Sequence, residues 1–86
     1  MDKIDQLFQE ENYIRDGESL ENVISYINFE DNQTISFNIE TKSIEIIKDT
    51  GEIINNNNLY GIVNLSLNII LIIYKMIEEL GWKNQK

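Results

Sequence analysis

The pattern of apolar and polar positions divides the chain into a helical start, a strand-rich middle and a helical end. Residues 2–11 place Ile4, Leu7 and Phe8 at helical spacing, with acidic residues near the positive end of the predicted helix. The polar segment 12–21 contains an Asp-Gly pair and predicts a loop. Residues 2–21 are therefore expected to hold one short amphipathic helix followed by a loop.

The middle of the chain predicts an antiparallel meander of three or four strands. Apolar and polar side chains alternate over 23–30 and 34–40, and apolar positions continue over 44–47. Asp-Asn and Thr-Lys pairs separate these runs and predict tight turns. A further turn is expected at 49–51, where a glycine can adopt the left-handed conformation, followed by a short fourth strand at 52–54.

The last third predicts a surface loop, an extended segment and a long helix. The polar tract 55–58 is expected to be the loop, and residues 59–65 an extended segment that could form a last edge strand. The apolar run that continues to residue 80 is too long for one strand, so it predicts a helix over 67–80 with Ser66 as the N-cap. A helix start near Ile62 is the alternative.

The expected end of this helix is marked by Gly81, which follows the last apolar position where a left-handed residue belongs. Trp82 is then expected to pack back on the helix as a structural residue. Together these elements predict a single α+β domain over residues 1–86. It consists of a short N-terminal helix, an antiparallel three- to four-stranded meander and a long C-terminal helix packed on the sheet.

The predicted C-terminal helix is apolar over more of its circumference than one sheet face can cover. One stripe suits the sheet: Ile69, Ile72, Ile73, Met76 and Leu80. A second stripe needs another partner: Leu67, Ile70, Leu71, Tyr74 and Ile77. Either the N-terminal helix covers it inside the same chain, or a second copy does so in a homodimer. The residues expected in a dimer contact are Leu67, Leu71 and Tyr74.

Composition removes several classes of chemistry. The chain has no cysteine and no histidine, which excludes disulfide frameworks, zinc fingers, thiol nucleophiles and histidine-dependent catalysis. Asp31 and Glu40-Thr41-Lys42 are similar to the metal site of restriction-type nucleases, but they fall in two predicted hairpin turns of an acidic protein. We therefore expect a non-enzyme with no catalytic residue, no metal and no cofactor.

The charge is strongly negative and unevenly distributed. The chain has 15 acidic and 7 basic residues, and residues 1–31 hold nine of the acids but only two of the bases. This charge disfavours nucleic acids and anionic membranes as partners, and favours the basic surface of another protein. The expected contacts on this acidic face are Glu10, Glu11, Asp16, Glu18, Glu30 and Asp31.

The N-terminal residues indicate the cellular location of the protein, and the amino-acid composition indicates the type of genome that encodes it. The first residues lack a basic region followed by an apolar stretch, and polar residues interrupt the most apolar segment, 59–77. We therefore expect a soluble, cytoplasmic protein. The absence of alanine beside 17 isoleucines and 12 asparagines is typical of an AT-rich genome.

Two resemblances point to mobile genetic elements. The ending Ile77-Glu78-Glu79-Leu80-Gly81-Trp82, after a strand-rich middle, is similar to that of small uncharacterised phage and prophage proteins of low-GC Gram-positive bacteria. The order helix, meander, helix, combined with strong acidity, resembles some anti-CRISPR inhibitors of Cas9. This resemblance implies occlusion of the DNA-binding site of a host nuclease by protein–protein contact.

The leading hypothesis is thus a non-catalytic, acidic accessory protein of a phage or mobile element, which inhibits a host factor by binding its basic surface. Two alternatives remain open. One is a homodimeric structural or adaptor module, and the other is a toxin-neutralising immunity protein, which would use the same acidic surface.

Overall fold

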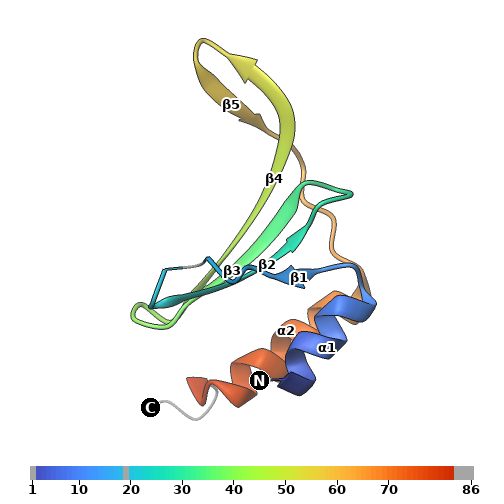
Figure 1. Ribbon diagram of the computed structural model, residues 1–86, viewed down its shortest axis with the longest axis vertical. Helices are drawn as coiled ribbons and strands as arrows, with labels where there is room; N and C mark the ends of the chain where they lie inside the picture. The colour runs from blue at the N-terminus through green and yellow to red at the C-terminus, as the bar shows by residue number, and fades with distance from the viewer. Residues whose placement is uncertain (1, 19, 83–86) are drawn as a thin grey trace.

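Five antiparallel strands form a sheet in which each strand pairs with its neighbour in sequence, and two helices lie side by side on one face (Figure 1). The computed structural model describes residues 2–18 and 20–82. The elements are α1 (Asp2–Glu10), β1 (Ile14–Arg15), β2 (Val23–Asn28), β3 (Gln33–Asn38), β4 (Ser43–Ile54), β5 (Asn57–Tyr60) and α2 (Leu67–Glu79). The predicted α+β class is confirmed, with more strands than the expected three or four.

One additional strand lies in the segment predicted to be a loop. Ile14 and Arg15 of β1 pair with Ile27 and Tyr26 of β2. The amide of Tyr13 donates to the carbonyl of Phe8 at 2.9 Å, which turns the chain from α1 back to the sheet. Two residues are too few to show an alternating pattern, so this strand forms through its tertiary contacts rather than through a local signal.

The turn predicted at 49–51 is wrong, because β4 continues through it. Gly51 does adopt the left-handed conformation, with φ of 80°, but the pairing register shifts between Asp49 and Ile53 and leaves a bulge inside the strand. The Oδ1 atom of Asp49 accepts a 2.8 Å hydrogen bond from the amide of Gly51. A bulge bends the strand that carries it, and β4 curves visibly away from the rest of the sheet (Figure 1).

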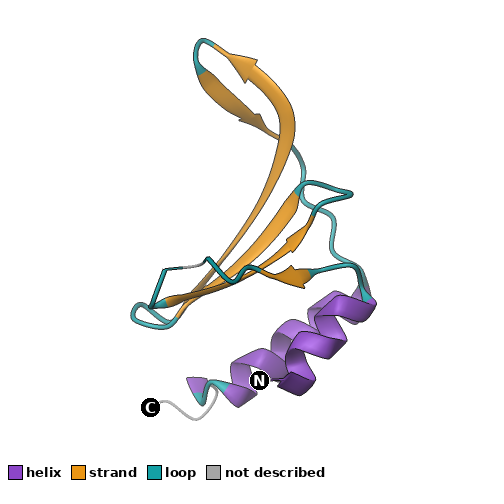
Figure 2. Ribbon diagram, in the orientation of Figure 1, coloured by secondary structure: helices purple, strands orange, loops and turns teal. Residues whose placement is uncertain are grey.

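The loop predicted at 55–58 is instead a tight turn and the start of β5. Ile54 pairs with Asn57, so only Asn55 and Asn56 form the turn, with φ of 53° and 65°. Two successive positive φ values are what a type I′ hairpin turn requires. We call residues 49–60 the arm. The arm extends beyond the other strands (Figure 2), and the molecule measures 43 × 27 × 23 Å.

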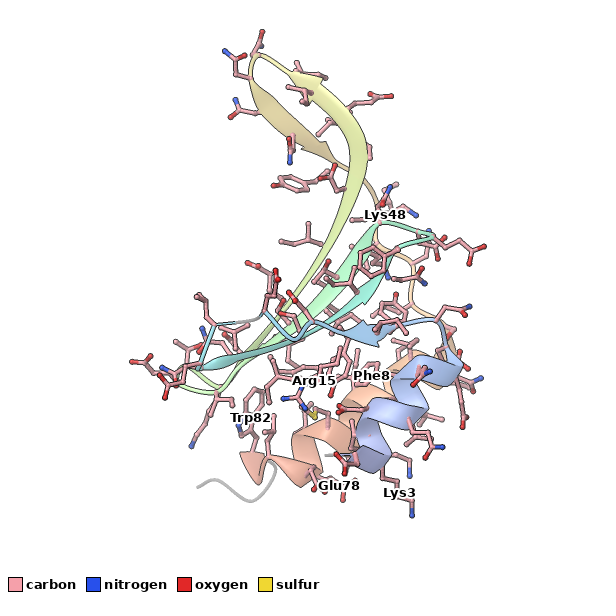
Figure 3. All side chains as sticks on the ribbon, viewed as in Figure 1. Lys3, Phe8, Arg15, Lys48, Glu78 and Trp82 are labelled. Atoms are coloured by element: carbon pink, nitrogen blue, oxygen red, sulfur yellow. The ribbon has the colours of Figure 1, made fainter. Side chains whose placement is uncertain are left out.

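The core lies between the sheet and the two helices. Phe8 of α1 is fully buried against Tyr26 of β2 and Phe37 of β3, and Figure 3 shows Phe8 between the helices and the sheet. The buried hydrophobic residues are Ile4, Phe8, Tyr13, Ile24, Tyr26, Ile35, Phe37, Ile69, Ile72 and Met76. Burying apolar side chains of α1, β2, β3 and α2 together is what holds the layers in place.

The boundaries of α2 confirm the capping signals. The hydroxyl of Ser66 accepts a hydrogen bond from the amide of Ile69, and the helix begins at the next residue, Leu67. Gly81 has φ of 78°, and its amide donates to the carbonyl of Glu78 at 3.0 Å. Trp82 packs on the core, with its ring centroid 6.4 Å from that of Phe37, which confirms its structural role.

The N-terminal helix does not cover the second apolar stripe of α2. Ile4 and Phe8 belong to the same buried cluster as Ile72 and Met76, because α1 lies beside α2 on the sheet and not over its outer side. Leu67 of the second stripe consequently remains 70% exposed. Of the two alternatives that the sequence leaves open, coverage by α1 is therefore not found at Leu67, Ile70 and Tyr74, which are exposed.

Candidate protein-interaction surfaces

Acidic residues gather where α1 ends and β2 turns into β3. Glu11 and Asp31 line the same hollow, of about 210 Å³. Glu10 and Glu11 also line a second hollow of about 230 Å³ between α1 and α2. Glu30 is exposed and directly precedes Asp31. We call Glu10, Glu11, Glu30 and Asp31 the acidic corner. Four of the six predicted contact residues thus lie together, two at the end of α1 and two in the turn between β2 and β3.

A buried polar network supports this corner. Nε2 of Gln33 donates to the hydroxyl of Tyr13 at 2.7 Å and to the carbonyl of Asn64 at 3.0 Å. The Asn28 side chain accepts from the amide of Asp31 at 3.0 Å and donates to its carboxylate at 3.4 Å. Burial raises the pKa of Tyr13, which keeps its hydroxyl protonated. Asn28 and Gln33 are buried, so these bonds fix the position of the corner from below.

The other two predicted contacts, Asp16 and Glu18, lie elsewhere. The amide of Asp16 donates to the carbonyl of Ser25 near the start of β2, whereas Asp31 follows the end of that strand. The Oδ1 atom of Asp16 accepts a 2.9 Å hydrogen bond from the amide of Glu18. The acidic residues therefore form two groups, one beside Ser25 within β2 and one past the end of that strand, and not one continuous face.

One of the two basic residues in the acidic third of the chain is already paired. Arg15 donates to Asp5 Oδ2 at 3.2 Å, and Tyr26 donates to Asp5 Oδ1 at 2.5 Å. Burial first, and then the Asp5 carboxylate, raise the pKa of Tyr26. Figure 3 shows Arg15 extending from the sheet toward the helices. This ion pair leaves Lys3 as the remaining base among residues 1–31.

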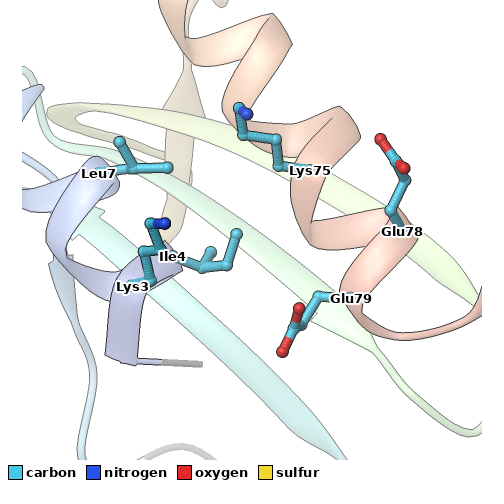
Figure 4. Close-up of a pocket in the computed structure, with 6 residues that line it drawn as sticks. All are labelled: Lys3, Ile4, Leu7, Lys75, Glu78 and Glu79. Atoms are coloured by element: carbon cyan, nitrogen blue, oxygen red, sulfur yellow. The ribbon is translucent and has the colours of Figure 1, made fainter.

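A groove between the two helices is balanced in charge. It measures about 340 Å³, and Figure 4 shows its lining residues: Lys3, Ile4, Leu7, Lys75, Glu78 and Glu79. Its lining contains two lysines and two glutamates, so this groove does not extend the acidic corner. Among residues 2–18 and 20–82 there is no group of three or more acidic side chains arranged to hold a metal ion.

Two exposed apolar surfaces remain. The first is the outer side of α2, where the predicted dimer contacts Leu67, Leu71 and Tyr74 are 70%, 51% and 45% exposed. Leu71 also lines the hollow beside Leu7 of α1, whereas Leu67 and Tyr74 are not among its lining residues. The second surface is the arm, whose exposed large apolar residues are Ile53, Ile54, Leu59 and Tyr60.

Sequence reasoning missed the arm and the polar network for different reasons. The arm was hidden because four successive asparagines are typical of a loop. Asn28 and Gln33 did leave a signal, since they fall in phase with the inward-facing residues Tyr26 and Ile35. A polar residue at an inward position predicts a buried hydrogen-bonding role.

No family model, curated protein or solved structure matches this chain. The resemblance to phage proteins and anti-CRISPR inhibitors therefore stays a prediction. Neither helix in the described part of the chain is long and apolar enough to cross a membrane.

Proposed function

We propose that this chain is a non-catalytic accessory protein of a phage or mobile element, which inhibits a host factor by binding to a basic surface such as the nucleic-acid groove of a nuclease. The observation that carries this proposal is the acidic corner, held in place by buried Asn28 and Gln33. A prearranged group of carboxylates attracts Lys and Arg side chains and loses little conformational entropy on binding them.

The position of Glu10 and Glu11 supports a role beyond solubility. They lie at the C-terminal end of α1, and the last turn of this helix contains no basic residue. The negative end of a helix dipole disfavours carboxylates, so these two residues destabilise the helix that carries them. Residues that break a local stability rule are concentrated at functional sites.

The separation of the two acidic groups favours an elongated partner site. Ser25, which bonds Asp16, and Asn28, which bonds Asp31, are three residues apart on β2, which corresponds to about 10 Å. A partner that contacts both groups needs basic residues spread over that length. A groove that binds a nucleic-acid backbone has this character, because its lysines and arginines follow successive phosphates.

Charge-matched variants test the proposal. The triple variant Glu10→Gln, Glu11→Gln, Asp31→Asn removes three charges from the acidic corner. The control variant Glu40→Gln, Glu45→Gln, Glu52→Gln removes three charges from exposed positions elsewhere. The tagged proteins are incubated with lysate of a low-GC Gram-positive host and with guide-loaded Cas9, at low and high salt, and bound protein and DNA cleavage are measured.

The wild type and the control variant are expected to retain a nucleic-acid-binding protein at low salt and to release it at high salt, whereas the corner variant retains much less. Inhibition of DNA cleavage would identify Cas9 as such a partner. Retention of a toxin instead would favour the immunity alternative. Retention of nothing at low salt, or equal loss in both triple variants, would contradict the proposal.

A further inference from the structure

None of the arm residues belongs to the hydrophobic core that residues 2–18 and 20–82 form. Every residue from 50 to 60 is exposed, and β5 pairs only with β4. The side chain of Ile53 is 70% exposed and that of Tyr60 is 60% exposed. A two-stranded hairpin without an apolar face packed on something else is marginally stable in water. The well-formed Asn55-Asn56 turn therefore shapes an arm that needs another surface to rest on.

The chain exposes more surface than a compact monomer of its mass, and the excess is similar to the area that one partner buries in an interface. A compact monomer of this mass exposes about 5,300 Å², but this chain exposes 6258 Å². Its radius of gyration is 13.5 Å, compared with about 12 Å for a compact domain of this length. The excess of about 1,000 Å² is close to the roughly 800 Å² that each partner buries in a standard interface.

The apolar surfaces occupy the part of the chain that can approach an identical copy without repulsion. Residues 1–31 account for −7 of the net charge of −8, so the part that carries the arm and α2 has a net charge of only −1. Leu67, Ile70 and Tyr74 are 45–70% exposed, and we call them the outer stripe of α2. No charged residue lies between Leu67 and Tyr74 in the sequence. A second copy can therefore pack its arm on this stripe with little repulsion between the arm and α2.

We infer that two copies of this chain form a twofold dimer in which the arm of each copy packs on the outer stripe of α2 of the other. This arrangement covers both exposed apolar surfaces at once, since the twofold axis repeats the same contact. It also supplies the arm with the apolar face that it lacks. The dimer rests on these apolar surfaces and does not depend on the proposed inhibitory function.

Pairing between two arms alone fits the surfaces less well. The outer edge of β5 is free to pair with another strand, but it is only four residues long. Such a short edge buries far less than the roughly 800 Å² of a standard interface, and it leaves the outer stripe of α2 in water. The reciprocal contact between arm and helix accounts for both surfaces.

Two variants and their mixture test this dimer by sedimentation equilibrium of the full chain. The arm variant is Ile53→Thr with Tyr60→Thr, which keeps the strand preference of both positions. The stripe variant is Leu67→Gln with Tyr74→Gln, which keeps a good helix preference. The wild type is expected at twice the chain mass of 10.1 kDa, and each variant alone at the monomer mass. All changed residues are exposed, so the far-ultraviolet circular dichroism of the body should be retained.

An equimolar mixture of the two variants is expected to regain dimer, because the intact arm of the stripe variant can pack on the intact stripe of the arm variant. The control Phe29→Ser removes a side chain that is 71% exposed outside both surfaces and should leave the wild-type dimer unchanged. A monomeric wild type overturns the proposal, as does a dimer that survives either variant. Loss of dimer in both variants without recovery in the mixture also overturns it, because an intact arm then fails to pack on an intact stripe. A dimer that survives only in the stripe variant indicates arm-to-arm pairing, and one that survives only in the arm variant indicates helix-to-helix pairing.

Discussion

The ring of Phe8 is stacked on the ring of Tyr26, with 4.0 Å between the ring centroids and 20° between the ring planes. Both side chains are completely buried, and they join α1 to the middle of the sheet. The same tyrosine donates a hydrogen bond to Asp5, so α1 is attached to β2 by an aromatic contact and a polar contact together. The position of Glu10 and Glu11 at the end of α1 depends on this attachment.

Replacing Phe8 by alanine is expected to unfold most of the protein. Removing a buried phenylalanine costs about 3–5 kcal/mol, which is a large part of the free energy of unfolding expected of a domain this small. Urea denaturation, monitored by circular dichroism, measures the decrease in the free energy of unfolding. Phe29→Ala changes an exposed phenylalanine and should alter the midpoint little. If Phe8→Ala lowered the free energy of unfolding by less than about 1 kcal/mol, Phe8 would not be a central residue of the core.

Alkaline pH is expected to destabilise the fold through Tyr13 and Tyr26. Both groups have a pKa raised above the ordinary value of 10.0, mainly by burial. Below pH about 10 both are protonated in the folded and unfolded states, and their contribution is fully present. As the pH rises through 10 toward the raised values, the unfolded state releases these protons first, so stability falls. The melting temperature measured against pH should therefore decline there, and Tyr26→Phe should make the decline shallower. If the melting temperature of Tyr26→Phe declined with pH as steeply as that of the wild type, Tyr26 would not contribute to the alkaline destabilisation.

Placing a positive charge at the end of α1 is expected to stabilise the protein while weakening partner binding. Glu10→Lys exchanges an unfavourable charge for a favourable one at the negative end of the helix dipole. The expected increase in melting temperature is a few degrees, on the order of that caused by 0.5 kcal/mol in a domain of this size. Glu52→Lys makes the same charge change on the arm and serves as the control. A lower melting temperature in the Glu10 variant would show that Glu10 is not placed as described.

The arm is expected to depend on the two asparagines of its turn. Asn56 has φ of 65°, a conformation that β-branched residues rarely adopt. Asn56→Val should therefore loosen the hairpin and speed hydrogen exchange at the amides of β5, while Asn56→Gly should retain their protection. Hydrogen exchange of the β5 amides, measured by nuclear magnetic resonance on both variants, tests this requirement for positive φ at position 56. Equal protection in the valine variant would mean that the turn does not have this conformation.

The parts of the fold predictable from the sequence are those encoded by neighbouring residues. Ser66 and Gly81 mark the ends of α2 through hydrogen bonds to residues within one helical turn, so their side-chain chemistry alone was sufficient. Gly51 was ambiguous, because a turn and a β-bulge both place glycine at positive φ. Only the pairing of β4 with β5 distinguishes them, and that pairing is not local.

The surfaces were predictable in composition but not in arrangement. The charge imbalance identified Glu10 and Asp31, yet their common location depends on how α1 packs against the end of β2. The separation of Asp16 from this corner likewise follows from its pairing with Ser25. The excess of apolar residues on α2 was visible in its periodicity. The failure of α1 to cover them was not, because it follows from both helices sharing one sheet face.

The contact between arm and helix can be observed directly by isotope-filtered nuclear Overhauser spectroscopy on a mixture of labelled and unlabelled wild-type chains. Cross-peaks are expected between ring protons of Tyr60 in one copy and methyl protons of Leu67 and Ile70 in the other. Such cross-peaks would show that the arm of one copy lies on α2 of the other copy. A spectrum without intermolecular cross-peaks, or with cross-peaks only between one arm and the other, would contradict the reciprocal dimer.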